Sequence, residues 1–244
     1  MIAMQFYLIF QAFVLVIVVM VQGREVAQKE REIRNMRAEI LTSQISRHFI
    51  YNTLTTIKHL CKTDAQLAAE TVDEFSGYLR GNLDSLTGAK MISFSKELGH
   101  VRNFLAIEQK RFGKRLRVLY DIQEEGFMLP PLTLQPVVEN AVKHGVTKRE
   151  RGGTIRISTG KDDTDYWIRV EDDGVGYYAE GKTKDQKAHV GMINVTSRVE
   201  SLCGGTVKAA SSLGAGTEVL IKIPRRGEYE REHRRGEYAD TDCG

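Results

Sequence analysis

An uncharged stretch at the start of the chain restricts what the rest of the chain can fold into. No Asp, Glu, Lys or Arg occurs from Ile2 to Gln22, and Phe13 to Val21 is wholly apolar. About 20 such residues are enough for a helix to cross the hydrocarbon core of a bilayer. Lys and Arg crowd the residues that follow and are absent before the stretch, so the positive-inside bias places the remainder in the cytoplasm. Residues 1–22 are therefore interpreted as a transmembrane helix, with a cleaved signal peptide and a buried core helix as alternatives.

The next part of the chain has helical periodicity. Four apolar residues recur at heptad-like spacing among charged ones: Val26, Ile33, Met36 and Ile40. This narrow stripe is typical of the seam of a parallel dimer, and a solvated linker helix is the alternative. Three more helices are predicted: Ser43 to Lys62, Thr63 (the start of a capping box) to about Leu86, and Lys96 to Arg111. We assign residues 23–112 to a signalling helix followed by a helical hairpin that mediates dimerisation.

From Arg115 onward the pattern changes to strands that alternate with helices. Five strands are predicted, at Arg117–Ile122, Thr154–Thr159, Tyr166–Asp172, Thr206–Ser211 and Thr217–Ile223. Two helices are predicted between them, at Leu134–Lys143 and Ile193–Leu202. This order indicates an α+β chain whose residues 113–224 form an α/β layer, with helices on a mixed or antiparallel sheet. Residues 225–244 form a charged near-repeat without apolar periodicity, which predicts a disordered tail.

Composition excludes several classes of protein. The apolar fraction of 41% is enough to bury a core. The 35 basic and 32 acidic residues are well mixed, so no single-sign field indicates direct binding to nucleic acid. The three cysteines are far apart and include no C-x-x-C pair, so neither a disulfide framework nor a zinc site is expected.

The segment from Thr133 to Gly145, TLQPVVENAVKHG, combines an apolar helix with polar side chains. Burying these groups costs free energy unless a ligand or solvent satisfies them. Asn140 and Lys143 are three residues apart and share a helical face, where an amide oxygen can hold hydrated Mg²⁺ while an ammonium meets phosphate oxygens. Glu139 is offset on the helix and either receives a proton, orients water or simply faces solvent.

Three glycine-containing segments follow. Asp172 precedes Gly174 and Gly176 at the end of a predicted strand, where a carboxylate can accept a hydrogen bond from an exocyclic amine such as that of adenine. Taken alone, this D-x-G-x-G pattern is more often an ordinary turn. A second segment, His189–Val195, opens a predicted helix, and a third, Gly214–Thr217, precedes a strand.

In their order and spacing, these four segments resemble the N box and glycine boxes of the Bergerat-fold (GHKL) ATPases. The resemblance covers about Leu116 to Pro224. It implies that Asn140 ligates Mg²⁺, Lys143 contacts phosphate and Asp172 binds the adenine amine. It further implies a nucleotide pocket shaped or contacted by His144, Gly174, Gly176, Gly191, Asn194 and Thr217. No G-x-x-x-x-G-K-[ST] motif is present, which excludes a Walker-type ATPase.

A histidine lies on the first hairpin helix, in the segment Gln44 to Leu54, QISRHFIYNTL. His48 and Asn52 are four residues apart, on one helical face. A lone helical histidine is usually a packing residue, but this segment resembles the phosphoacceptor box of the LytS/YesM-type sensor histidine kinases, whose N box has the same Q-P-x-V-E-N-A-x-K-H-G form. In that family a proline precedes the histidine; here that position is Arg47, which adds a cation beside His48. Without the proline we expect a straighter helix and an altered rate of phosphotransfer.

The resemblance implies a two-component sensor kinase that autophosphorylates His48 from Mg-ATP, with Asn52 and Glu139 as further candidate catalytic residues. It implies a homodimer anchored in the bacterial cytoplasmic membrane through residues 2–22, with its kinase domains in the cytoplasm. The expected partner is a response regulator of the LytTR or AraC type, whose aspartate takes the phosphoryl group. A catalytically weak pseudokinase scaffold and another GHKL ATPase are the alternatives.

Overall fold

The computed structural model describes residues 47–84, 90–177 and 186–225, which form parts of two compact units, residues 1–50 and 51–244. The predicted transmembrane helix, the signalling helix before residue 47 and the tail after residue 225 lie outside the described residues. Within the described residues, no helix has the length and apolar character that a membrane span requires.

Two helices begin the described chain. They are α2 (Arg47–Thr63) and α3 (Ala65–Asp84), joined at Asp64. The Asp64 side chain accepts a hydrogen bond from the backbone N–H of Leu67 at 2.9 Å, so Asp64 caps α3. The capping box predicted to begin at Thr63 is therefore wrong by one residue, because the Thr63 hydroxyl donates back to the carbonyl oxygen of His59.

Helix α3 packs against α4 (Phe94–Phe112), which matches the third predicted helix within two residues at each end. Two glycines allow the close approach. A Cβ at Gly77 would lie 2.5 Å from Nδ2 of Asn103, and one at Gly81 would overlap the imidazole of His100. Side chains at these two positions would therefore force the helices apart.

All five predicted strands are confirmed, and they form one mixed sheet of order β2-β4-β5-β7-β6. The strands are β2 (Leu116–Ile122), β4 (Gly153–Lys161), β5 (Asp165–Asp172), β6 (Thr206–Ser212) and β7 (Gly216–Pro224). β2 pairs in parallel with β4, and the other pairs are antiparallel. Two very short strands that were not predicted, β1 (Ile92–Ser93) and β3 (Met128–Leu129), pair separately.

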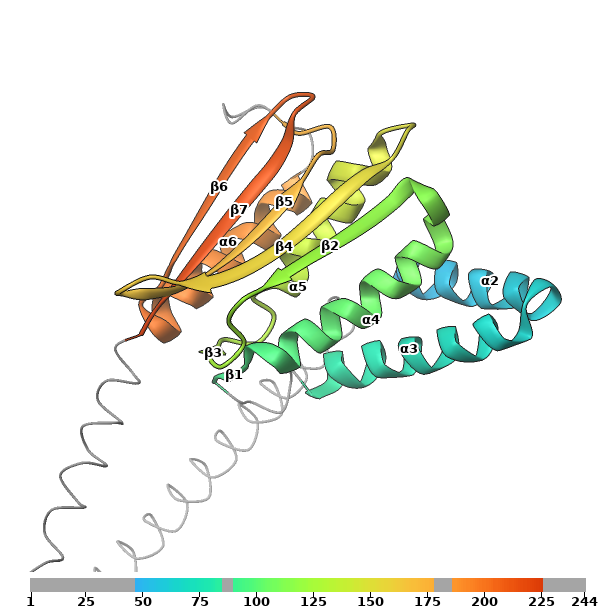
Figure 1. Cartoon of the computed structure of the whole chain (residues 1–244), viewed down its shortest axis with the longest axis horizontal. Helices are drawn as coiled ribbons and strands as arrows, with labels where there is room; N and C mark the ends of the chain where they lie inside the picture. The colour runs from blue at the N-terminus through green and yellow to red at the C-terminus, as the bar shows by residue number, and fades with distance from the viewer. Residues whose placement is uncertain (1–46, 85–89, 178–185, 226–244) are drawn as a thin grey trace, which may run out of the picture. The chain divides into compact units, whose positions relative to one another are not determined.

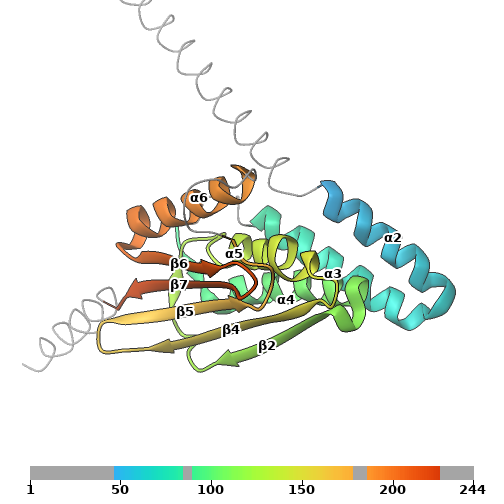
Figure 2. The ribbon, with the colours of Figure 1, turned by 90° about the horizontal axis from the view of Figure 1, so that it is seen from above.

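Helices α4, α5 (Gln135–Asn140) and α6 (Gln186–Cys203) lie on one face of the five-stranded sheet (Figures 1 and 2). Residues of β5 alternate between buried and partly exposed along the whole strand, as expected for a sheet covered on one face. The rings of Phe94, Phe127 and Tyr166 stack in sequence, with centroids 4.8 Å apart in each pair. This apolar layer anchors the end of β5 that lies opposite Asp172.

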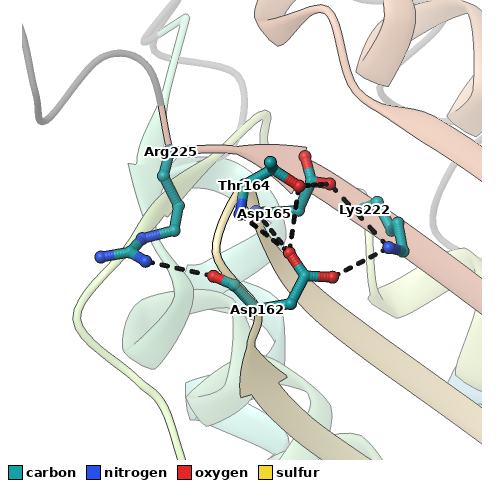
Figure 3. A network of polar contacts seen from close by, with 5 residues as sticks. All are labelled: Asp162, Thr164, Asp165, Lys222 and Arg225. Atoms are coloured by element: carbon teal, nitrogen blue, oxygen red, sulfur yellow. Dashed lines mark hydrogen bonds and ion pairs between the residues drawn. The ribbon is translucent and has the colours of Figure 1, made fainter.

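The end of β5 that begins at Asp165 carries a network of polar contacts (Figure 3). Oδ1 of Asp162 accepts hydrogen bonds from the backbone N–H groups of Thr164 and Asp165, and its Oδ2 lies 3.0 Å from Nζ of Lys222. Arg225 donates to the carbonyl oxygen of Asp162 at 3.1 Å. The network ties the turn between β4 and β5 to the end of β7.

Candidate functional site

Asp172, the last residue of β5, is the centre of a tightly packed group. Its side chain is only 8% exposed, and its Oδ1 accepts a hydrogen bond from Gly174 N at 2.9 Å. A Cβ at Gly145 would lie 2.5 Å from the same Oδ1, and a Cβ at Gly216 would overlap the carbonyl oxygen of Asp172. Thr217 lies opposite Asp172 in the pairing of β5 with β7. Gly145 and Gly174 thus pack against the Asp172 carboxylate, and Gly216 packs against the backbone of the same residue.

Burial raises the pKa of Asp172 to about 6. The neighbouring charge of Asp173 raises it further, whereas hydrogen bonds from Gly174 and Thr217 stabilise the carboxylate and lower it. Asp172 is therefore mostly ionised at neutral pH, and it keeps acceptor capacity for a donor from a ligand. A buried carboxylate with these properties is typical of a binding site.

The loops beside Asp172 are also held by backbone contacts. Gly176 has φ of 59°, and a Cβ there would overlap the carbonyl oxygen of Ser212. The backbone N–H of Val175 donates to the carbonyl oxygen of Gly145 at 3.3 Å, and the Ser211 and Thr217 hydroxyl oxygens are 3.0 Å apart. The N-box segment and the first and third glycine segments, which the sequence analysis singled out separately, therefore meet at this end of the sheet.

The N-box helix is shorter than predicted. Helix α5 ends at Asn140, and Ala141–Gly145 continues as a π-helical turn, η2, followed by the 3₁₀ turn η3 (Val146–Lys148). The prediction that the α-helix continues to Lys143 is therefore wrong. Because a π turn is wider than an α turn, Asn140 and Lys143 are not on a regular α-helical face. The wide turn ends at Gly145, the glycine that packs against Asp172.

The second glycine segment approaches the site from α6. A Cβ at Gly191 would lie 3.7 Å from Nδ2 of Asn140, so this part of α6 is next to the N-box helix. Gly191 does not open the helix as predicted, because α6 already begins at Gln186. Lys143 and Asn194 are exposed, and His144 is partly buried.

Glu139 does not point freely into solvent. Its Oε1 accepts a hydrogen bond from Gln135 Nε2 at 2.8 Å, and the same nitrogen donates to Oδ1 of Asn82 at 3.1 Å. Burial is the main cause of the raised pKa of Glu139, although Gln135 and the charge of Lys143 favour the ionised form. Burial and the charge of Glu139 raise the pKa of Tyr78. Asn82 and Tyr78 lie on α3, so side chains from the predicted hairpin contact the N-box helix.

A buried carboxylate that no sequence pattern indicated holds the start of α5. Glu97 on α4 accepts backbone hydrogen bonds from Leu132, Leu134 and Gln135 at 3.1, 3.1 and 3.2 Å. Arg198 on α6 donates to the carbonyl oxygens of Pro131 and Leu132 at 2.8 and 3.0 Å. Leu132 has φ of 59°, an unfavourable conformation for a leucine. The contacts from Glu97 and Arg198 stabilise this turn.

His48 lies on α2, and its side chain is exposed, whereas that of Phe49 is only 5% exposed. Asn52, one turn later, is partly buried. The exposed imidazole and the buried aromatic ring therefore point to different sides of the helix. His48 belongs to the unit of residues 1–50.

The side chains of the site fit a Mg²⁺ ion whose ligands come mainly from phosphate and water. Within residues 47–84, 90–177 and 186–225, no group of three or more His, Cys, Asp or Glu side chains could hold a metal ion. Mg²⁺ needs only one or two protein ligands when phosphate oxygens and water supply the rest. The partly buried amide of Asn140 fits that role.

Comparisons with known proteins agree with this geometry. The model of the histidine kinase family matches residues 36–116, and that of the histidine kinase-, DNA gyrase B- and HSP90-like ATPases matches residues 131–227. YwpD of Bacillus subtilis is 41% identical over 77% of this chain and 70% of its own length.

Two relatives are named as sensors. The sensor histidine kinase YpdA of Escherichia coli is 34% identical over 82% of this chain and 36% of its own length. The sensor protein LytS of B. subtilis is 28% identical over 87% of this chain and 38% of its own length. The chain therefore spans little more than a third of either sensor. Matches to both family models and to these relatives show that the chain belongs to the LytS/YesM-type sensor histidine kinases.

Proposed function

We propose that the chain is an ATP-dependent protein-histidine kinase that phosphorylates its own His48. The observation that carries the proposal is the group at the end of β5, where Gly145 and Gly174 pack against the buried carboxylate of Asp172 and Gly216 packs against its backbone. A site that orients a purine needs this combination of a preset acceptor and close backbone approach. The exposed imidazole on α2 supplies the acceptor of the phosphoryl group.

Asp172 binds the base in this proposal. Its ionised carboxylate accepts a hydrogen bond from the exocyclic amine of adenine, and Thr217, paired with Asp172 across β5 and β7, lies beside the ring. The glycines at positions 174 and 176 let the loop backbone approach the flat ligand. Gly191 on α6 completes the pocket next to Asn140.

Asn140 and Lys143 serve the phosphates. The Asn140 amide oxygen would hold Mg²⁺, whose charge offsets that of the phosphate oxygens, and the exposed Lys143 ammonium contacts those oxygens. His144 and Asn194 remain candidate phosphate contacts. Glu139, which Gln135 holds by a hydrogen bond, is a candidate catalytic residue next to Asn140. Asn52 is a second candidate, one helical turn from His48.

The chemical step is a transfer between two nucleophiles. A neutral imidazole nitrogen of His48 bonds to the γ-phosphorus, and the bond between that phosphorus and the β–γ bridging oxygen breaks. ADP leaves with the electron pair, and the imidazole loses its N–H proton to solvent. A phosphohistidine results, from which the aspartate of a response regulator takes the phosphoryl group.

The proposed oligomeric state, membrane anchor and partner are those that the family resemblance implies. We propose a homodimer of hairpins held in the bacterial cytoplasmic membrane by residues 2–22, with the kinase in the cytoplasm. A regulator of the LytTR or AraC type is the proposed partner. Incubation of membranes containing the kinase with purified regulators and labelled ATP would identify the cognate one.

Labelling with [γ-³²P]ATP tests the proposal. We expect the wild-type chain to acquire a label that is stable in base and labile in acid, and His48→Gln to acquire none. His59→Gln, a change at an exposed histidine on the same helix, is the matched control and should label normally. Nucleotide binding without label on the wild-type chain would favour a pseudokinase scaffold, and release of phosphate without phosphohistidine would favour another GHKL ATPase.

A further inference from the structure

Arg149, which directly follows η3, joins the two loops that flank Asp172. Its Nη1 donates to the carbonyl oxygen of Asp173, and its Nη2 donates to the carbonyl oxygen of Gly214 at 2.8 Å. Asp173 lies in the loop after β5, and Gly214 lies in the turn between β6 and β7. One planar guanidinium therefore bridges two segments that follow different strands of the sheet.

Both acceptors are linked to the residues around Asp172. Oδ1 of Asp173 accepts a hydrogen bond from Thr154 N at 2.6 Å, which fixes the start of its loop to β4. Gly214 has φ of 79°, and its backbone N–H donates to the carbonyl oxygen of Val175 at 2.7 Å. A shift of either tip would move Gly174 or Gly216, the glycines in contact with Asp172.

The backbone of Arg149 is itself anchored. Its carbonyl oxygen accepts hydrogen bonds from Arg115 Nη2 at 3.1 Å and from Gly152 N at 3.0 Å. Its N–H donates to the carbonyl oxygen of Val146 at 3.2 Å. The guanidinium therefore extends from a fixed point, which is the condition under which a side chain can determine the position of two loops.

We propose that Arg149 is a positioning residue for the adenine end of the nucleotide site. Its guanidinium holds the loop after β5 and the turn before β7 in the arrangement in which the Asp172 carboxylate meets the base. This inference rests on the function proposed above. Arg149 touches neither the phosphates nor His48 in this scheme, so its loss affects recognition of the base and not the transfer step.

The test uses the full chain carrying Arg149→Ala or Arg149→Lys. Arg151→Ala, which removes an exposed arginine two residues away, is the matched control. The measurements are the KM for ATP, the autophosphorylation rate at saturating ATP, and the dissociation constants of ATP and GTP. Thermal unfolding of each variant reports whether the fold is retained.

Arg149→Ala should raise the KM for ATP about tenfold, as expected from two lost charge-assisted hydrogen bonds that together position one contact. The rate at saturating ATP should stay within about twofold of wild type, because the transition-state contacts are intact. Arg149→Lys should recover less than half of the loss, since one ammonium does not reproduce the two-pronged geometry. Binding of GTP, whose base carries an oxygen in place of the adenine amine, should change less than binding of ATP.

Equal KM values for Arg149→Ala and Arg151→Ala would overturn the inference, as would a fall in the saturating rate with unchanged KM. A parallel loss of ATP and GTP affinity would assign Arg149 a general structural role and would also overturn it. If Arg149→Ala does not fold, Arg149→Lys carries the same comparison. Failure of the wild-type chain to bind ATP would instead refute the proposed function.

Discussion

The two ends of strand β5 each have an aspartate, and their surroundings are opposite. Asp172 is buried, and burial raises its pKa to about 6. Asp162, in the turn before β5, is exposed; hydrogen bonds from Lys222 and then from backbone N–H groups lower its pKa below the ordinary value (Figure 3). Ionisation of an aspartate is thus unfavourable at the Asp172 end of the strand and favourable at the Asp162 end.

The difference matches the roles proposed for the two groups, ligand binding for Asp172 and structural support for Asp162. The Asp162 carboxylate already has three hydrogen-bond donors on Oδ1 and an ion pair on Oδ2, so little acceptor capacity remains for a ligand. Asp172 is packed by glycines, whose missing side chains leave room for backbone and ligand close to the carboxylate. Burial of a carboxylate at a glycine-lined position indicates function more reliably than the number of acidic residues does.

The largest expected effect is from Asp172→Asn. An amide at this position presents N–H donors toward the adenine amine, so ATP affinity should fall about a hundredfold. The free energy of unfolding should change by no more than about 1 kcal/mol, because the variant also removes a buried charge. Calorimetric titration with ATP and thermal unfolding measure the two quantities. An unchanged dissociation constant for ATP would show that Asp172, like Asp162, has a structural role and does not bind the base.

The next largest effect is expected from Gly145→Ala. Its Cβ would lie 2.5 Å from Oδ1 of Asp172, so the carboxylate or the π turn must shift. We expect a destabilisation of about 1–3 kcal/mol, as for other overpacked sites, with weaker ATP binding. Gly126→Ala is the control, since a Cβ there meets no atom within 4 Å. Equal unfolding midpoints for the two variants would contradict the close packing around Asp172.

The pH dependence of binding should reflect the raised pKa of Asp172. With a pKa of about 6, the carboxylate is protonated as the pH falls through that value, so ATP affinity should fall about tenfold between pH 7 and pH 5. The contribution of Asp172 to stability has the opposite sign: the folded state binds the extra proton, so stability decreases as the pH rises from about 4 to about 6.

Asp172→Asn is the control for this measurement, because it retains the titration of the nucleotide itself. The difference between the two proteins in binding free energy for ATP, taken at each pH, isolates the contribution of the carboxylate. Identical pH profiles for the two proteins would exclude Asp172 as the titrating group in ATP binding.

The smallest effect is expected from Asp162→Asn. ATP affinity should stay within about twofold of wild type, because the change lies at the opposite end of β5. Because the folded pKa of Asp162 is lowered, its contribution to stability is present above the ordinary value of 3.8 and is lost as the pH falls below it. Acid unfolding monitored by circular dichroism should show a smaller loss below pH 4 for the variant. A weakened ATP site would mean that the two ends of the strand are coupled.

Local patterns in the sequence predicted the strands and most of the helices. Alternating apolar residues located β5, and the family resemblance assigned Asp172, Gly174 and Thr217 to one site, where the structure brings them together. Such patterns depend on neighbours within a few residues, and the sheet register then brings β5 and β7 together. The predicted cap of α3 was one residue away from the observed cap, Asp64, because Thr63 and Asp64 are both suitable capping residues.

Other parts of the site depend on contacts between distant segments and were not predictable. The Glu97 carboxylate bonds to the turn around Leu132, 35 residues away, and no periodicity distinguishes it from a surface glutamate. The π turn after Asn140 could not be predicted from the sequence either, since the residues of AVKHG before the glycine are also found in ordinary α-helices. Arg149 lies in a segment with several basic residues, and only the structure shows which of them bridges two loops.

The hydrogen-bonded chain from Asn82 through Gln135 to Glu139 links the orientation of α3 to the residues beside Asn140. If α3 rotated about its axis, either the amide of Gln135 would lose its partner on that helix or it would follow and leave Glu139. An unsatisfied buried amide costs about 1–3 kcal/mol. Loss of one of these hydrogen bonds would therefore change an equilibrium between two orientations of α3 by about five- to a hundred-and-fiftyfold.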